Sequence, residues 1–258
     1  MKAAMPSLKA RLSLNDPVYG LFCSTPAALT VELVAAAGYD FVVIDLEHTL
    51  IGAEQLAAML LAARASGIAA LVRVAAPHQV VQALDAGAEG IVFPRIRSAQ
   101  SAHDAVSFCH FAPCGERGLN ATWHSRYGRD DLSATIDAAR KKTLVVVMIE
   151  DAEGLDQAHD IAAVDGVDVL LEGAADLSQS LGFPWQTRHP EVLTAVSRIR
   201  AAARHHGKVF CALPRAPEDF QASYQDQVRM FILGDDRGIA RRAMAAHLTQ
   251  HQVRGIGQ

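Results

Sequence analysis

The chain has 258 residues, half of them hydrophobic, and a formal net charge of -4 from dispersed acidic and basic residues. No basic stripe is available to bind a phosphate backbone, so nucleic acid is not an expected partner. No apolar run reaches the roughly 18 residues that a membrane span needs, and the N-terminus lacks the apolar core of a signal peptide. We therefore expect a soluble, cytoplasmic protein without a membrane partner, acting on a small molecule.

Eight short apolar runs divide the chain, and most are followed by Ala-rich segments with helical periodicity. The runs cover residues 19–24, 41–47, 68–74, 90–95, 144–150, 167–173, 208–214 and 230–235. Strands that alternate with helices are typical of a parallel sheet, and eight such units in about 250 residues predict a (β/α)₈ TIM barrel. No linker or composition shift interrupts the pattern, so we expect a single domain over residues 1–258.

Barrels of this class build their active sites at the C-terminal ends of the strands. Polar residues that close the apolar runs are therefore the candidates for chemistry, and we expect them to converge on one face. They are Asp45, Glu47, His48, Arg73, Arg95, Glu150, Glu172, Asp176, Arg215 and Asp235.

The second and third strands supply a candidate base and a candidate cation. Alternation along a strand sends Asp45 and Glu47 to the same side, where they could orient the ring of His48 and raise its basicity. Arg73 closes the otherwise apolar third strand, where a guanidinium needs an anionic partner. That partner could be a substrate carboxylate or developing oxyanion, or simply Asp45 or Glu47, just as His48 could be structural.

A segment of about 30 residues, from Phe111 to Lys141, separates the helix after the fourth strand from the fifth strand. Loops of this length are usually lids or interfaces. Its polar and aromatic residues could meet an anionic substrate, or could only stabilise the loop: Arg117, Asn120, Trp123, His124 and Arg126. The cysteines are scattered, which favours reduced, structural thiols, although Cys109 and Cys114 could bridge or bind a metal.

The fifth and sixth strands supply a pair of carboxylates. Glu150 ends one strand, and Asp176 follows the next where a helix should begin, so the two could share a hard cation such as Mg²⁺. Asp176 could instead only cap that helix. The small residues Gly173, Ala174 and Ala175 would let backbone amides approach an anion. A metal ion, Arg73 and a His48 base would together act on a 2-oxo acid, forming or breaking a carbon–carbon bond.

Five segments are similar, in order and spacing, to the HpcH/HpaI class of metal-dependent aldolases: YDFVVIDLEH, LVRV, LDAGAEGIVFPRI, MIED and VDGVDVLLEGAADLSQSLG. The resemblance covers residues 17 to 248. It implies a (β/α)₈ barrel, a hexamer with exchange of a C-terminal helix, and pyruvate-type substrates. It further implies metal binding by Glu150 and Asp176, His48 as base, Arg73 as oxyanion stabiliser and Asp45 as the acid that orients the histidine.

The chain also departs from the aldolases. Met148 stands where they commonly have Gln, and Glu172-Gly173-Ala174 replaces a Gly-Pro. Together with EGAADLSQSLGFPWQTR, FCALPR and FILGDDRG, these departures resemble the citrate-forming branch that serves staphyloferrin B siderophore biosynthesis. This branch implies condensation of oxaloacetate with acetyl-CoA to citrate and CoA. The carboxylate pair and the aldolase resemblance make Mg²⁺ or Mn²⁺ the expected metal, although this branch could position oxaloacetate with little help from a cation. A class II aldolase using pyruvate, and a non-catalytic scaffold, remain the alternatives.

Overall fold

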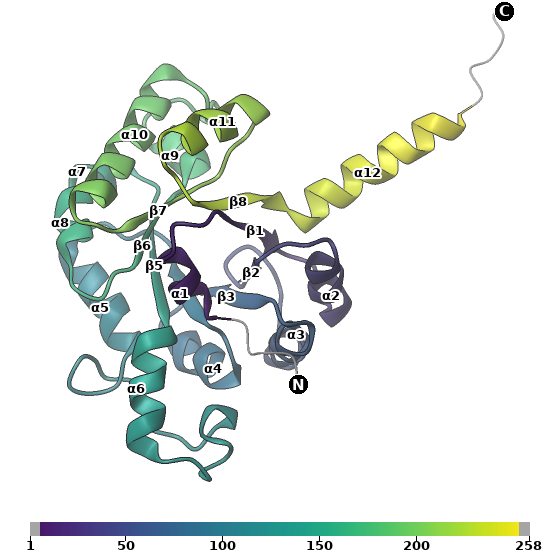
Figure 1. Ribbon diagram of the computed structural model, residues 1–258. Coiled ribbons are helices and arrows are strands. Elements are labelled where there is room, and N and C mark those ends of the chain that lie inside the picture. The colour runs from purple at the N-terminus through teal and green to yellow at the C-terminus, as the bar shows by residue number, and fades with distance from the viewer. Residues whose placement is uncertain (1–5, 253–258) are drawn as a thin grey trace, which may run out of the picture.

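A computed structural model describes residues 6–252. Eight parallel strands close into a barrel in chain order, which confirms the predicted (β/α)₈ fold (Figure 1). The strands are β1 (Val18–Cys23), β2 (Phe41–Asp45), β3 (Ala69–Arg73), β4 (Gly90–Phe93), β5 (Leu144–Ile149), β6 (Val169–Glu172), β7 (Val209–Ala212) and β8 (Met230–Asp235).

The helices are α1 (Leu8–Leu12), α2 (Ala28–Ala36), α3 (Ala53–Ser66), α4 (His78–Ala86), α5 (Ala99–Cys109), the 3₁₀ turn η1 (Trp123–Ser125), α6 (Leu132–Lys142), α7 (Ala152–Asp156), α8 (Ala158–Ala163), α9 (Ala174–Ser180), α10 (Pro190–His205), α11 (Pro217–Gln225) and α12 (Asp236–His251). One helix, α1, precedes the first strand, and the others follow the strands and, except for α12, surround the barrel (Figure 1). Within residues 6–252, no helix is long and apolar enough to cross a bilayer.

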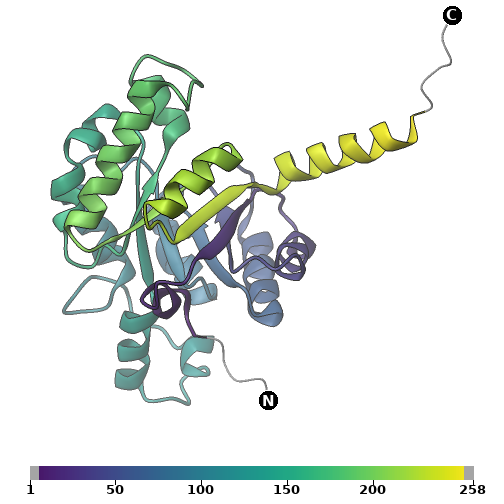
Figure 2. The same cartoon turned by 45° about the horizontal axis from the view of Figure 1, so that its top comes forward.

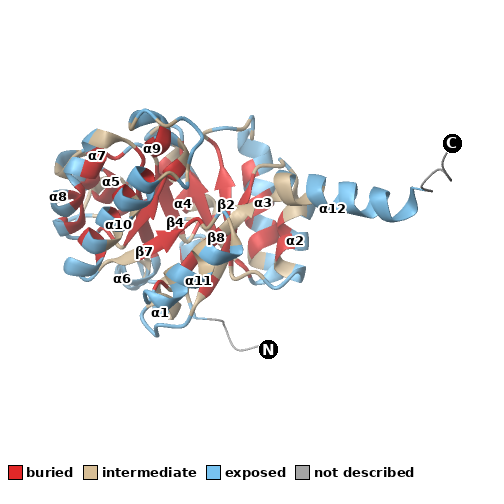
Figure 3. Ribbon diagram, turned by 90° about the horizontal axis from the view of Figure 1, so that it is seen from above, coloured by how far each residue is buried: buried red, intermediate tan, exposed pale blue. Residues whose placement is uncertain are grey.

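Most strand residues are buried, as expected for a parallel barrel covered on both faces, whereas the last three residues of β8 are half-buried (Figure 3). Alternate residues of each strand fill the barrel interior, and the others form a second core beneath the helices. The interior set includes Phe41, Val43, Leu71, Val146 and Met148. Because side chains alternate with a period of two, these rows continue at the C-terminal ends of the strands into Asp45, Arg73 and Glu150.

Helix α1 closes the opposite, N-terminal end of the barrel. Leu8 is buried in the interior core, and its amide donates to the Glu89 carboxylate at 3.0 Å. Lys9 forms an ion pair with Asp168 at 2.8 Å. Glu89 and Asp168 each lie one residue before a strand begins, so the closed end is remote from the predicted site.

Helix α12 leaves the barrel after β8 and projects away from it in both views (Figures 1 and 2). It buries none of its residues, and Met244 and Leu248 are 70% and 59% exposed. Its start is fixed to the barrel because Asp235 caps it and the Asp236 carboxylate accepts from the Ser24 and Thr25 amides.

The four cysteines are free, as their scattered positions predict. Cys23, Cys109 and Cys211 are buried, and burial raises the pKa of each thiol.

Candidate active site at the C-terminal end of the barrel

Asp45 and Arg73 form a buried ion pair at the mouth of the barrel. The two residues are direct neighbours in the β2–β3 register. Arg73 Nε and Nη2 donate to the two carboxylate oxygens of Asp45 at 2.9 and 2.8 Å. Burial raises the pKa of Asp45, but the hydrogen bonds and charge of Arg73 and the amides of Glu47 and His48 outweigh it, so the pKa is lowered overall. Asp45 therefore fixes the guanidinium in one orientation.

The ring of Phe22, at the end of β1, lies beneath the same guanidinium, with its centroid 4.7 Å from Arg73 Cζ. Phe22 is a site residue that was not predicted from the sequence. Its place in the inward-facing row of the first strand is the signal that could have identified it.

Glu47 connects three cationic or polar groups from different strands. Its Oε1 accepts from Arg95 at 2.7 Å. Its Oε2 lies 3.4 Å from Arg73 Nη1 and 3.6 Å from His48 Nε2, and this buried atom has no hydrogen-bond partner in the described chain. A buried carboxylate oxygen without a donor is costly, so it is available to a ligand or to a protonated His48.

The ring of His48 is open to solvent, with 58% of its side chain exposed. The resemblance implies that Asp45 orients this ring. In the structure, Asp45 reaches only the His48 backbone amide, at 3.4 Å, and Glu47 is the carboxylate beside the ring nitrogen. The difference arises because the bidentate contact with Arg73 already occupies both oxygens of Asp45.

Glu150 lies next to the same cluster. The Arg95 amide donates to Glu150 Oε1 at 2.7 Å. Burial raises the pKa of Glu150 to about 7, and the charges of Glu47 and Asp176 contribute to the rise. A carboxylate whose ionised form is disfavoured by burial and by other carboxylates is suited to bind a cation.

Gly173 makes room for the Glu150 carboxylate. A Cβ at position 173 would lie 2.3 Å from Glu150 Cβ, 2.8 Å from Glu150 Oε2 and 2.9 Å from the terminal carbon of Met148. Only glycine allows this close approach of β6 to β5. The absence of a side chain thus keeps Oε2 accessible.

Asp176 is exposed in the first turn of α9, while Gly173 occupies the N-cap position. The alternative that Asp176 is simply the helix cap is therefore wrong. Asp176 is close enough to Glu150 to raise its pKa. One carboxylate follows β5, in space that a Cβ at position 173 would fill, and the other lies in the first turn of α9. Their oxygen atoms are ligands of the kind that Mg²⁺ and Mn²⁺ prefer, so the residues present fit the expected metal.

The amides of the Gly173–Ala175 turn are only partly available to an anion. The Gly173 amide donates to the Ile149 carbonyl at 3.0 Å, and the Ala174 amide lies close enough to the Glu172 carboxylate to lower its pKa. Of the three predicted donors, Gly173 is therefore already paired and Ala174 faces Glu172, whereas the Ala175 amide has no hydrogen-bond partner within the part of the chain that the structure describes. Periodicity could not reveal this, because both acceptors depend on tertiary packing.

Glu172 does not join the other carboxylates. Its side chain is buried on the outward-facing parity of β6, where Oε1 accepts from the Leu213 amide at 2.9 Å. Burial raises its pKa. Glu172 therefore ties the end of β6 to the residue that follows β7. The expectation that its side chain converges with the other site residues is wrong.

The long segment before β5 does not reach the active site. Its residues pack at the N-terminal end of the barrel, where Arg117 pairs with Asp85 at 2.7 Å. Trp123 lies beneath Arg64 at 4.3 Å, and His124 Nε2 contacts the Leu84 carbonyl at 3.0 Å. The loop-stabilising alternative is therefore right.

Two further arginines, one in this segment and one in the loop after β7, have local roles. Arg126 pairs with Asp130 within the loop itself. Arg215 is exposed at the C-terminal end, and its amide donates to Asp219 at 3.2 Å.

Comparison with known proteins agrees with this geometry. The family model of HpcH/HpaI aldolase/citrate lyase matches residues 18–243. The crystal structure of citrate synthase SbnG is 44% identical, covers 95% of this chain and 96% of its own, and has a TM-score of 0.89.

Curated relatives include aldolases. The 4-hydroxy-4-methyl-2-oxoglutarate aldolase cghB of Chaetomium globosum is 40% identical, with 70% of this chain and 69% of the relative covered. A hydroxypyruvate/pyruvate aldolase of Paraburkholderia phytofirmans is 37% identical, with 78% and 80% covered. The chain therefore belongs to the HpcH/HpaI aldolase/citrate lyase family.

Proposed function

We propose that this chain is a citrate synthase that condenses oxaloacetate with acetyl-CoA and water to give citrate and CoA. The observation that carries the proposal is the similarity to citrate synthase SbnG, which extends over nearly the full length of both chains. The two curated aldolases are less similar, at 40% and 37% identity, and match over 70% and 78% of the chain. The apolar side chain of Met148, packed beside Gly173 below the carboxylates, further supports a departure from the aldolase pattern.

Glu150 and Asp176 would hold a divalent cation, Mg²⁺ or Mn²⁺. When bound, the cation supplies Lewis-acid polarisation of the 2-oxo group and charge neutralisation among the carboxylates. The free Ala175 amide would donate to the oxaloacetate carboxylate. These groups would present the C2 ketone of oxaloacetate toward Arg73.

His48 would act as the general base that removes a methyl proton from acetyl-CoA. Its exposed ring can reach a co-substrate arriving from solvent, and Glu47, 3.6 Å from Nε2, would stabilise the imidazolium that forms. The acetyl-CoA enolate carbon would then form a bond with the C2 carbon of oxaloacetate.

Arg73 would stabilise the alkoxide that develops at C2. Asp45 holds this guanidinium by Nε and Nη2, which leaves donors on Nη1 for the substrate. Preorganised donors of this kind are worth far more than mobile ones, because they need no reorganisation during the reaction. Hydrolysis of the thioester would release CoA and citrate, the latter for a carboxylate siderophore.

The alternative is a class II aldolase that uses the same residues with pyruvate and an aldehyde, and the curated relatives favour it. The test is release of free CoA thiol from acetyl-CoA with and without oxaloacetate. Release that requires oxaloacetate, with citrate as product, supports the synthase. No release, together with cleavage of a 4-hydroxy-2-oxo acid to pyruvate, would establish the aldolase instead.

Site variants separate either enzyme from a non-catalytic scaffold. We expect His48→Ala to reduce turnover by about 10²- to 10⁴-fold, the usual contribution of a general base. The matched control is His103→Ala, which removes an exposed histidine of α5. Equal activity of the two variants would contradict the role of His48.

We also propose that α12 packs against a neighbouring subunit in a homo-oligomer, a hexamer by family resemblance. Its exposed Met244 and Leu248 have no contact with the barrel core of their own chain. Light scattering coupled to size exclusion measures the particle mass, and a monomer would contradict the proposal.

A further inference from the structure

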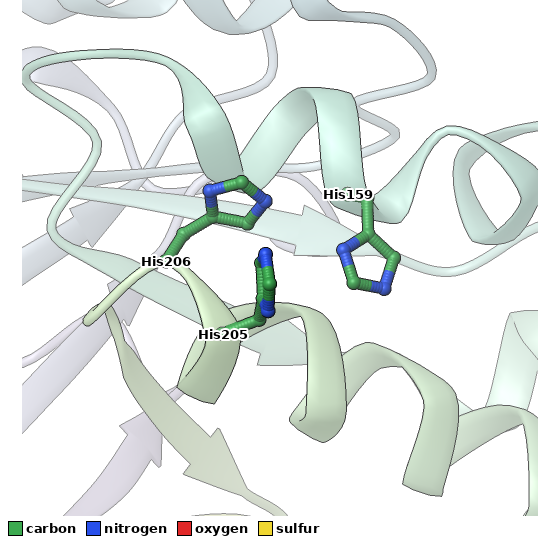
Figure 4. A group of neighbouring side chains, drawn as sticks. All are labelled: His159, His205 and His206. Atoms are coloured by element: carbon green, nitrogen blue, oxygen red, sulfur yellow. The ribbon is translucent and has the colours of Figure 1, made fainter.

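Three histidines meet on the outer surface of the barrel, away from the active site. His159 comes from α8, His205 is the last residue of α10, and His206 caps that helix. Figure 4 shows the three rings facing one another, and one ring nitrogen from each lies within 4.8 Å of the other two. His206 is three residues before β7, which places the cluster toward the N-terminal ends of the strands, opposite the carboxylates.

The convergence of these rings depends on the packing of α8 against α10. Adjacent helical residues point about 100° apart, so neighbouring histidines do not usually face the same point. Here the chain leaves the helix at His206, and the His205 and His206 rings meet edge to face with centroids 4.8 Å apart. The His159 ring lies 5.5 and 5.7 Å from them.

The distances fit a small transition-metal ion after modest side-chain rotation. Tetrahedral ligands at about 2.0–2.1 Å from zinc are about 3.3 Å from one another. His159 and His205 are exposed and His206 is half-buried, so the rings can close this gap without moving the backbone.

The electrostatics also favour a cation bound by neutral imidazoles. Desolvation and the neighbouring His205 and His159 lower the pKa of His206, with Lys208 adding to the effect and Asp160 opposing it. The C-terminal end of α10 carries the negative end of the helix dipole, which stabilises a nearby positive charge.

We propose that His159, His205 and His206 bind one divalent transition-metal ion of the kind that prefers imidazole, such as Zn²⁺. Three nitrogen ligands leave the fourth position of a tetrahedral ion to water. The bound ion would join α8 to α10 from outside. This site differs in chemistry from Glu150 and Asp176, whose oxygen ligands suit Mg²⁺.

The test is calorimetric titration of the untagged full-length chain with ZnCl₂ in excess Mg²⁺, which is added to compete for the proposed carboxylate site. A second histidine pair on α12, His247 and His251 with ring centroids 4.5 Å apart, could also take up zinc. The titrations are therefore made in a His247→Ala/His251→Ala background. His159→Ala is compared with this parent and with His103→Ala, which removes an isolated exposed histidine.

We expect saturable binding of one Zn²⁺ per chain in the parent and in His103→Ala. His159→Ala should weaken it by about 100-fold or more, because a lost ligand costs at least as much as a lost outer-shell partner. Zn²⁺ should likewise raise the thermal midpoint of the parent but not of His159→Ala. Absence of saturable binding in the parent, or equal affinity in His159→Ala, would overturn the proposal, whether or not the chain proves to be a citrate synthase.

Discussion

Replacing Glu150 with Gln should change how the stability of the protein depends on pH. The Glu150 pKa is raised from 4.5 to about 7, chiefly by burial and further by the charges of Glu47 and Asp176. The residue is only 3% exposed, so solvent screens these effects weakly. Glutamine keeps the size of the side chain and its ability to accept from the Arg95 amide, but it cannot ionise.

The direction in which stability changes with pH follows from the number of protons that Glu150 binds in the folded and unfolded states. A carboxyl group whose pKa is higher in the folded state binds more protons there than in the unfolded state. Its contribution to stability is therefore full below pH 4.5 and is lost as the pH rises to about 7. At about 1.4 kcal/mol per pKa unit, ionising Glu150 costs the folded state about 3 kcal/mol. Most of that change falls between pH 5 and pH 8.

The assay is urea unfolding of wild type and Glu150→Gln at fixed protein concentration, with a chelator present, at pH 5 and pH 8. The wild type should lose about 2 to 3 kcal/mol relative to the variant over this interval. Excess Mg²⁺ should remove the loss, since a bound cation favours ionised Glu150. Glu116→Gln, which removes an exposed carboxylate, is the control and should follow the wild type. Parallel pH profiles for wild type and Glu150→Gln would refute the reasoning.

Three further changes test the packing around the site and the role of α12 in the assembly. Gly173→Ala should destabilise the fold by about 1–3 kcal/mol in urea unfolding and lower turnover, because the added methyl group meets a carbon atom at 2.3 Å. Gly118→Ala, into open space, should be nearly neutral, and equal effects of the two would contradict the packing argument. Asp45→Ala should cost about 3–5 kcal/mol in the same measurement because it leaves the buried Arg73 without its bidentate partner, and unchanged stability would contradict the ion pair. Ending the chain after residue 240 should keep the barrel circular dichroism but reduce the particle mass seen by light scattering, and an unchanged mass would exclude α12 from the subunit interface.

The sequence predicted the barrel because its signal is local and repeated. Each apolar run coincides with a strand, and most of the strands end before the apolar run does, as in the run 41–47 where β2 ends at Asp45. The same alternation correctly placed Asp45 and Arg73 at the mouth, and the strand register makes them neighbours. Residues that continue a strand's inward-facing row are thus predictable from sequence.

Partners chosen by tertiary packing were not predictable. Alternation puts both Asp45 and Glu47 near His48, but only the bidentate geometry of Arg73 decides that Glu47 faces the ring. The segment that contains Arg117 leaves the helix α5 at the N-terminal end of the barrel and stays there, because Arg117 finds an acidic partner on α4. Its composition alone could not distinguish a lid from a structural loop.

The charges at the mouth of the barrel predict an order of binding. Four carboxylates and two guanidinium groups gather there: Asp45, Glu47, Glu150, Asp176, Arg73 and Arg95. Above pH 7, where Glu150 has also lost its proton, the six groups carry a net charge of -2, from four negative and two positive groups. Oxaloacetate is itself a dianion, so this cluster alone repels it, whereas a divalent cation brings the sum to zero.

We therefore expect oxaloacetate to bind weakly to chelated protein and more tightly once Mg²⁺ or Mn²⁺ is present. Thermodynamic reciprocity requires oxaloacetate to tighten metal binding by the same factor. Calorimetric titration of each ligand in the presence and absence of the other measures both sides of this coupling. Equal oxaloacetate affinity with and without metal would mean that the guanidinium groups alone neutralise the substrate. The carboxylates of Glu150 and Asp176 would then need a role other than holding a cation.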